Sequence, residues 1–253
     1  MMITIKKPVI LAIALMLFQL SSAQSIKVAV AANLQSVIKV LDADFTKRTG
    51  IQVETIIGSS GNLTTQIKNG APFDLFLSAD MNFPQSLYAD GFTADKPVVY
   101  AAGSLIVCST QNLDLKHWQT LILEDDITKI AIANPNIAPY GKAAAEALTN
   151  LNILDKTKSK TVTGESIAQV NTYITTGVVS LGFTSQSLLM DGNQPAKLYW
   201  APVDKKLYNP IQQGVVILKF GTANHPQQSQ KFYKYLQSSP ARAIFKKYGY
   251  IVQ

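Results

Sequence analysis

Four short joints in this chain place small, donor-rich residues where an extended segment is followed by a helical pattern. They lie at residues 31–34 (AANL), 58–63 (GSSGNL), 134–141 (NPNIAPYG) and 164–167 (GESI). A helix start exposes backbone N–H groups that have no partner within the helix, and it carries the positive end of the helix dipole. One such joint is ordinary capping. Four joints rich in Ser, Asn, Gly or Tyr predict donors that converge on a shared anion.

Strand and helix patterns alternate along the chain between these joints. The segment after Asn33 repeats apolar residues on one face of a 3.6-residue period, at Leu34, Val37, Ile38, Leu41 and Phe45. Alternation of this kind predicts an α/β fold built from mostly parallel sheets with helices on both faces. Such sheets bind ligands at the carboxyl ends of their strands, and all four joints are expected there.

The order of these patterns predicts two lobes. Gly103 interrupts a long extended stretch that begins at Val98, and such an interruption lets the chain pass from one lobe to another. From about Gln213, one strand and two helices remain, which is too little for a separate domain. Packing this end back onto the first lobe gives lobe 1 as residues 24–103 and 207–253, and lobe 2 as residues 104–206.

The N-terminus has the features of a secretory signal peptide. Lys6 and Lys7 precede an apolar run from Val9 to Phe18, and residues 21–23 (SSA) supply small side chains for cleavage. The apolar run is too short to span a bilayer comfortably, and no cysteine follows it as a lipoprotein signal would require. We therefore expect residues 1–23 to be removed from an exported protein.

Composition narrows the possible partners. Without the two lysines of the signal segment, 21 of the 23 basic residues remain against 16 acidic ones, which gives a net charge of +5. The positive surplus is spread out, which favours anionic ligands at long range. No basic stripe is interleaved with aromatic residues, so we expect no nucleic-acid site. The single cysteine, Cys108, lies in an apolar run and is interpreted as a buried packing residue.

Seven segments of the chain resemble, in the same order, the molybdate-binding proteins of bacterial ABC importers, a family of two-lobed periplasmic binding proteins. They span nearly the whole mature chain, at residues 31–34, 58–61, 71–80, 134–141, 164–169, 181–183 and 244–250. The resemblance implies an α/β fold of two lobes, each a mostly parallel sheet flanked by helices, with the ligand in the cleft between the lobes.

The resemblance also implies a tetrahedral oxyanion held by neutral donors at Asn33, Ser60, Tyr140 and Ile167. These residues would hold the metal only as molybdate, through its oxygens. Ser60 offers a hydroxyl and an N–H, whereas Tyr140 and Ile167 would give backbone N–H groups. Taken singly, Asn33 and Ser60 would be ordinary N-caps and Ile167 a core residue. Their occurrence in this order at four strand ends favours the ligand role.

One departure from the best-known branch of the family concerns Ser185. That branch has a ligand Tyr soon after its Leu-Gly motif, where this chain reads Phe183-Thr184-Ser185. The chain is therefore more similar to a second branch, in which an Asn-type donor follows the first strand. No role is assigned to Ser185 on this basis.

The implied function is capture of molybdate, and with it tungstate, for delivery to an inner-membrane ABC permease. The resemblance implies a periplasmic monomer that is not an enzyme and uses no cofactor. Molybdate and tungstate are fully ionised at neutral pH and offer only acceptors, whereas a phosphate site benefits from an acidic acceptor. None of the four positions is acidic, which favours molybdate, tungstate or sulfate over phosphate. Selection between molybdate and sulfate would rest on cavity size.

Three alternatives stay open at this point. The first is a binder of sulfate or another tetrahedral oxyanion on the same fold. The second is a secreted hydrolase with Ser60 as nucleophile, although neither His117 nor His225 lies in a recognisable triad or metal-site spacing. The third is an amino-acid or peptide binder on the same fold, which would need a paired arginine and carboxylate, whereas Arg48 and Arg242 lie late in predicted helices away from the joints.

Overall fold

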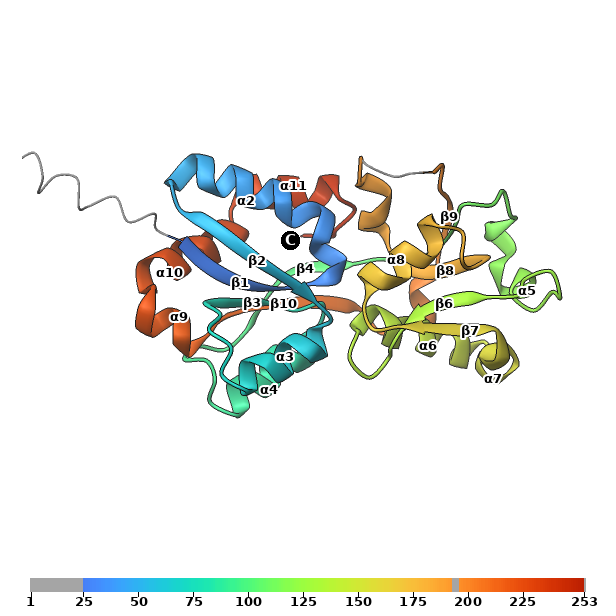
Figure 1. Cartoon of the computed structure of the whole chain (residues 1–253), viewed down its shortest axis with the longest axis horizontal. Coiled ribbons are helices and arrows are strands. Elements are labelled where there is room, and N and C mark those ends of the chain that lie inside the picture. Colours follow the sequence, from blue (N-terminus) through green and yellow to red (C-terminus); the bar gives the residue numbers. More distant parts are fainter. Residues whose placement is uncertain (1–24, 193–195, 253) are drawn as a thin grey trace, which may run out of the picture.

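The framework of the molecule consists of two five-stranded sheets. The two sheets lie side by side along its long axis (Figure 1). The computed structural model describes residues 25–192 and 196–252, so the predicted signal peptide lies outside the described residues. The first sheet has the order β2-β1-β3-β10-β4, with β1 (Ser25–Ala31), β2 (Gln52–Gly58), β3 (Leu75–Leu77), β4 (Val98–Gly103) and β10 (Ile211–Ile217). The second has the order β7-β6-β8-β5-β9, with β5 (Leu105–Ser109), β6 (Ile130–Ala133), β7 (Thr161–Gly164), β8 (Leu181–Ser185) and β9 (Tyr199–Pro202).

Helices cover both faces of the first sheet. They are α2 (Gln35–Thr49), α3 (Ser60–Lys68), α4 (Asn82–Ala89), α9 (Lys219–Asn224), α10 (Pro226–Leu236) and α11 (Ser239–Lys247), preceded by the 3₁₀ turn η1 (Ala32–Leu34). One core joins β1 to α2, α10 and α11 through residues such as Phe45, Phe232 and Phe245. A second core on the opposite face joins the sheet to α3 and α4 through Leu63, Phe76 and Leu87.

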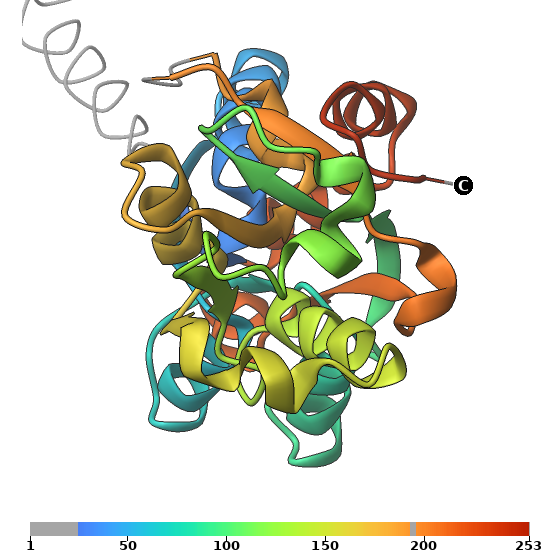
Figure 2. The ribbon, with the colours of Figure 1, turned by 90° about the vertical axis from the view of Figure 1, so that its right-hand side faces the viewer.

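The second sheet is flanked by α5 (Trp118–Leu121), α6 (Pro139–Asn150), α7 (Leu154–Thr157) and α8 (Ile167–Thr175). Its 3₁₀ turns are η2 (Leu115–His117), η3 (Lys158–Lys160), η4 (Gln186–Met190) and η5 (Lys205–Leu207). Figure 2 looks onto this part of the molecule, with α6 and α7 below the sheet. Buried alanines on α6 let that helix approach the sheet closely, and Trp118 meets Phe183 edge to face within the same core.

The predicted α/β fold with two helix-flanked sheets is confirmed, and each sheet is mixed rather than wholly parallel. In the first sheet, β10 runs antiparallel to β3 and β4, and in the second, β5 runs antiparallel to β8 and β9. β5 and β10 are the strands that the chain enters after crossing from the other sheet. The parallel strands end at the edge that faces the other sheet, so a strand entered from that edge runs the opposite way.

The chain crosses between the sheets at Ser104 and again between Pro202 and Ile211. Below, lobe 1 means the first sheet with its helices, and lobe 2 means the second. The predicted boundary at residues 206/207 stays a prediction, and the core of lobe 2 includes Tyr208. Within residues 25–192 and 196–252, no helix has the length and apolar character needed to cross a membrane.

Candidate functional site

All four joints meet at one small cavity between the lobes. Residues of both lobes surround it: Ala31, Ala32, Asn33, Ser59, Ser60, Ala79, Ala138, Pro139, Tyr140 and Ile167. None of these lining residues carries a charged side chain. The volume open to the centre of a water molecule is about 10 Å³, which leaves no room for a peptide or a nucleotide.

Each predicted site residue lies in the first turn of a helical segment. Ser60 and Ile167 are the first residues of α3 and α8, Tyr140 is the second residue of α6, and Asn33 is the second residue of η1. N–H groups in a first turn have no partner within their own helix, and a helix N-terminus carries partial positive charge. The structure therefore brings together four backbone N–H groups from three α-helices and one 3₁₀ turn, a donor set that matches the oxygens of an anion.

The hydroxyl of Ser60 is set up as a donor. Its Oγ accepts the backbone N–H of Ala79 at 3.0 Å, which fixes the oxygen and leaves the hydroxyl proton to be donated elsewhere. The helix cap belongs to the preceding residue, because Ser59 Oγ accepts the N–H of Asn62 at 3.4 Å. The interpretation of Ser60 as an N-cap is therefore wrong, since Ser60 already lies inside α3.

Tyr140 and Ile167 use their side chains for packing. The Tyr140 ring is buried, and its hydroxyl lies 3.3 Å from Gln213 Nε2 in lobe 1. Burial raises the pKa of the Tyr140 phenol well above its ordinary value, so the hydroxyl stays protonated. The Ile167 side chain belongs to the core of lobe 2, behind the N-cap Ser166. With both side chains packed in the interior, the backbone N–H groups are the donors that these two residues present at the cavity.

Asn33 has surroundings that the sequence did not predict. It does not cap a helix, because α2 begins only at Gln35 and η1 has no side-chain cap. Its Nδ2 instead donates to Gln213 Oε1 at 2.9 Å and to Tyr250 Oη at 3.2 Å. Its Oδ1 is buried and has no hydrogen-bond partner among the described residues. The Asn33 side chain is therefore incompletely paired at the wall of the cavity.

Sequence reasoning missed the polar residues behind Asn33. Gln213 is fully buried on β10 and bonds Tyr100, Asn33 and Tyr140. The Tyr250 hydroxyl donates to the Asn33 carbonyl oxygen at 2.7 Å. The one available signal was a pair of glutamines, Gln212 and Gln213, in a strand whose other residues are apolar or glycine. Alternation along a strand turns one of the two inward, and glutamine is unusual at a buried position.

Ser185 is buried but does not line the cavity. Its Oγ lies 2.8 Å from Ser187 Oγ, and Ser187 donates to the Asn33 carbonyl oxygen at 2.7 Å. This end of lobe 2 therefore supports the η1 turn from behind.

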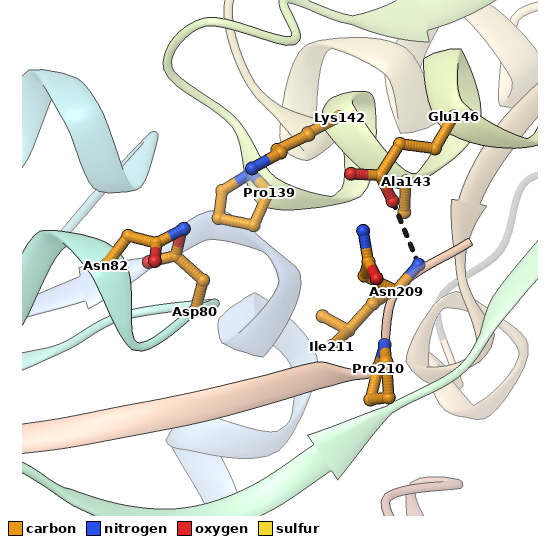
Figure 3. Close-up of a pocket in the computed structure, with 9 residues that line it drawn as sticks. All are labelled: Asp80, Asn82, Pro139, Lys142, Ala143, Glu146, Asn209, Pro210 and Ile211. Carbon is orange, nitrogen blue, oxygen red and sulfur yellow. Dashed lines mark hydrogen bonds between the residues drawn. The ribbon is translucent and has the colours of Figure 1, made fainter. Parts of the chain in front are cut away.

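Charged side chains lie outside the cavity, in a neighbouring groove of about 70 Å³ (Figure 3). Asp80 and Asn82 of lobe 1 face Pro139 and Lys142 of lobe 2 there. Burial raises the pKa of Asp80, and hydrogen bonds that its carboxylate accepts and the nearby Lys142 partly oppose that rise. Glu146, in the same groove, accepts the backbone N–H of Asn209 at 2.9 Å. The oxyanion donors are therefore not opposed by a lining carboxylate.

The two histidines considered as bases for a hydrolase pair with aspartates away from the cavity. His117 Nδ1 pairs with Asp114 at 2.7 Å, and His225 Nδ1 pairs with Asp74 at 2.8 Å. Neither histidine lines the cavity, so Ser60 has no neighbouring imidazole base. The geometry favours binding over nucleophilic chemistry.

Comparison with known proteins agrees with a binding protein. Residues 26–251 match the family model described as bacterial extracellular solute-binding protein. The chain belongs to this family. This solute-binding protein is 37% identical over 235 residues to the molybdate-binding protein ModA of Azotobacter vinelandii, with 92% of each chain covered. It is 34% identical to ModA of Rhodobacter capsulatus, over 92% of this chain and 90% of that one.

Solved structures also place the chain beside molybdate-binding proteins in fold. The periplasmic molybdate-binding protein of Azotobacter vinelandii superposes with a TM-score of 0.81 at 31% identity, over 90% of this chain and 99% of that one. The resemblance inferred from the sequence segments is therefore confirmed. The sulfate-binding protein SubI of Mycobacterium tuberculosis superposes with a TM-score of 0.71 at 12% identity, which shows a shared fold only.

Proposed function

We propose that this protein captures molybdate outside the cytoplasm and delivers it to an ABC import permease. The observation that carries the proposal is the cavity between the lobes, with four helix-start N–H groups and one free hydroxyl proton but no charged lining residue. Such a site satisfies an anion that offers only acceptors. The relatives named as molybdate-binding proteins support the same ligand.

Tungstate belongs in this proposal because it has the same charge and shape as molybdate and also lacks a proton at neutral pH. Neutral donors can stabilise a buried dianion because hydrogen bonds to charged acceptors are short and strong. Protonated phosphate would bring a donor to a cavity lined by donors, so we expect it to bind poorly. Sulfate has the right charge but a smaller radius, and its weaker binding would follow from poorer contact with the cavity wall.

In this proposal the site residues are Asn33, Ser60, Tyr140 and Ile167, and the ion binds between two lobes that close around it. Lobe 1 comprises residues 24–103 and 207–253, and lobe 2 comprises residues 104–206. Donors from both lobes must reach one ion, so binding draws the lobes together. The protein acts as a periplasmic monomer, it catalyses no reaction, and it needs no cofactor.

A thermal-shift panel tests the ligand class. Unfolded and refolded protein, freed of bound ions, is heated with molybdate, tungstate, sulfate, phosphate and a mixture of amino acids. A ligand present at a thousand times its Kd stabilises the folded state by about 4 kcal/mol. We expect a large rise in melting temperature with molybdate and tungstate and little with amino acids or phosphate. A shift with amino acids alone would overturn the proposal.

A further inference from the structure

Gln213 is the centre of a buried polar network that reaches both lobes. Its side chain is fully buried on β10 of lobe 1. Its Oε1 lies 2.9 Å from Asn33 Nδ2 and 2.9 Å from Tyr100 Oη, and its Nε2 lies 3.3 Å from Tyr140 Oη in lobe 2. Gln213 thus touches one proposed ligand residue of each lobe.

The protons of this network do not all have acceptors when the amides are oriented in this way. The Tyr100 hydroxyl faces two acceptors, Gln213 Oε1 and the Ser78 carbonyl oxygen at 3.2 Å, but a phenol has one proton to give. The Tyr140 hydroxyl receives a hydrogen bond from Gln213, and its own proton finds no acceptor among the described residues. Asn33 Oδ1 likewise receives no hydrogen bond.

Turning both side-chain amides by 180° removes each of these conflicts without moving another heavy atom, since only hydroxyl protons rotate. Gln213 Nε2 then donates to Tyr100 Oη and to Asn33 Oδ1, and Tyr100 gives its proton to the Ser78 carbonyl. Tyr140 donates to Gln213 Oε1. Asn33 no longer donates to Tyr250. The Tyr250 hydroxyl lies 2.7 Å from the Asn33 carbonyl oxygen and 3.2 Å from the turned Oδ1, and its proton is shared between these two acceptors, the carbonyl also accepting from Ser187. The Asn33 Nδ2 then takes the place of the unpaired Oδ1.

The two amides must turn together. If only Asn33 turned, its Oδ1 would face Gln213 Oε1 at 2.9 Å, and two acceptor oxygens at that distance repel each other. Gln213 therefore decides which atom of the Asn33 amide is free. A free Nδ2 is a donor for an oxyanion, whereas a free Oδ1 would repel it.

We propose that Gln213 is the positioning residue of the anion site, which holds the Asn33 amide with Nδ2 free to donate to the bound oxyanion. The inference rests on the proposed function, because it assumes that the cavity lined by Asn33 binds such an ion. Through Tyr140 the same glutamine links the amide orientation to lobe 2. Gln213 itself does not line the cavity, so it acts through Asn33.

A double-mutant cycle with molybdate titration tests this role. The four proteins are wild type, Gln213→Met, Asn33→Ala and the double variant, with Gln212→Met as the control at a neighbouring exposed glutamine. Losing one hydrogen bond to a charged acceptor costs about one to two decades in affinity, so we expect that loss for Asn33→Ala. We expect about a tenfold loss for Gln213→Met in the wild-type background and less than about twofold in the Asn33→Ala background. Gln212→Met should bind as wild type does.

The outcomes distinguish the positioning role of Gln213 from molybdate binding itself. Equal losses from Gln213→Met in both backgrounds, or no loss in either, would overturn the positioning role while leaving molybdate binding intact. Failure of wild type to bind molybdate would overturn the proposed function itself. If Gln213→Met does not fold, the side-chain amide NMR signals of molybdate-saturated wild type decide. A nuclear Overhauser effect from the Gln213 amide protons to the Tyr100 ring supports the role, and one from the Asn33 amide protons to the Tyr250 ring contradicts it.

Discussion

The backbone N–H of Gly61 donates a 2.9 Å hydrogen bond to the carbonyl oxygen of Ile137, so the first turn of α3 in lobe 1 is bonded directly to lobe 2. A Cβ at Gly61 would lie 2.8 Å from Ile137 Cβ and 2.9 Å from its Cα. Only glycine therefore allows the lobes to approach this closely. Ser187 adds a second link between the lobes by donating to the Asn33 carbonyl oxygen at 2.7 Å.

Gly61→Ala is expected to hold the lobes apart and to weaken molybdate binding. Overpacking of this kind costs roughly 1–3 kcal/mol, which corresponds to about one to two decades in affinity. Titration calorimetry measures the affinity, and small-angle scattering measures whether molybdate still compacts the protein. Asn62→Ala, at an outward position on the same turn, is the control and should bind normally. Wild-type affinity in Gly61→Ala would show that this contact is not needed for binding.

Gly103 at the first crossing leaves room for the Tyr140 hydroxyl. A Cβ there would lie 1.9 Å from Tyr140 Oη, so we expect Gly103→Ala to destabilise the protein by about 1–3 kcal/mol. Adding Tyr140→Phe removes the clashing oxygen and should restore part of that loss in a denaturant titration. Gly192→Ala is the control, because nothing lies within 4 Å of its Cβ position. If Tyr140→Phe restored none of the loss, the clash would not be its cause.

The two serines at the start of α3 are expected to separate binding from stability. Ser60→Ala removes a hydroxyl proposed to donate to the ion and should cost about 1.5–3 kcal/mol, or one to two decades in molybdate affinity. Ser59→Ala removes the helix cap and should cost about 0.5–2 kcal/mol of stability with little change in affinity. Melting temperature and affinity are measured on both variants. Unchanged molybdate affinity in Ser60→Ala would remove Ser60 from the site.

The carboxyl group of Asp42, on α2, is expected to make the stability of the protein depend on pH. Burial raises the pKa of Asp42 from 3.8 to about 7, and its Oδ1 has no hydrogen-bond partner among the described residues. A raised pKa means that the folded protein holds this proton more tightly than the unfolded chain does. The contribution of Asp42 is therefore most favourable near pH 4 and is lost as the pH rises to 7.

Asp42→Asn removes that titration, so we expect the variant to melt above wild type at pH 8 and close to it at pH 4. The gain at pH 8 should be roughly 1–3 kcal/mol, because the amide carries no charge whereas the buried carboxylate does. Asp44→Asn is a control of opposite sign, because a hydrogen bond from Arg48 lowers the pKa of Asp44. Its loss of stability should be present at pH 7 and fade in acid. A parallel pH profile for wild type and Asp42→Asn would contradict the assignment.

The sequence was sufficient to place candidate site residues at helix starts, but it did not predict which side chains surround them. The strand-to-helix joints carry local signals, so Ser60, Tyr140 and Ile167 could be placed at helix starts without any knowledge of packing. The exception was Asn33, whose side chain bonds residues 180 and 217 positions away. No local pattern contains such contacts, and a short polar side chain before a helix is read by default as a cap.

The same limit explains the other differences. Serine is a favoured N-cap residue, so the sequence alone does not tell Ser59 from Ser60. They are distinguished by the end of β2 at Gly58 and by the hydrogen bond that Ser60 Oγ accepts from the Ala79 N–H. The reversed direction of β5 and β10 follows from where the chain crosses between sheets, which is a tertiary property. Gln213 could be recognised as unusual in a buried strand, but its partners lie on three different elements, η1, β4 and α6.

Titration calorimetry of refolded, ion-free wild-type protein against molybdate and sulfate tests the central claim most directly. The cavity offers neutral donors to one small anion, so we expect one molybdate per chain with high affinity and sulfate binding that is weaker by several decades. Competition, with sulfate present in excess, extends the measurement to tight binding. Equal affinities for the two anions would contradict selection by the size of the cavity, and the absence of any heat with molybdate would contradict the proposed function.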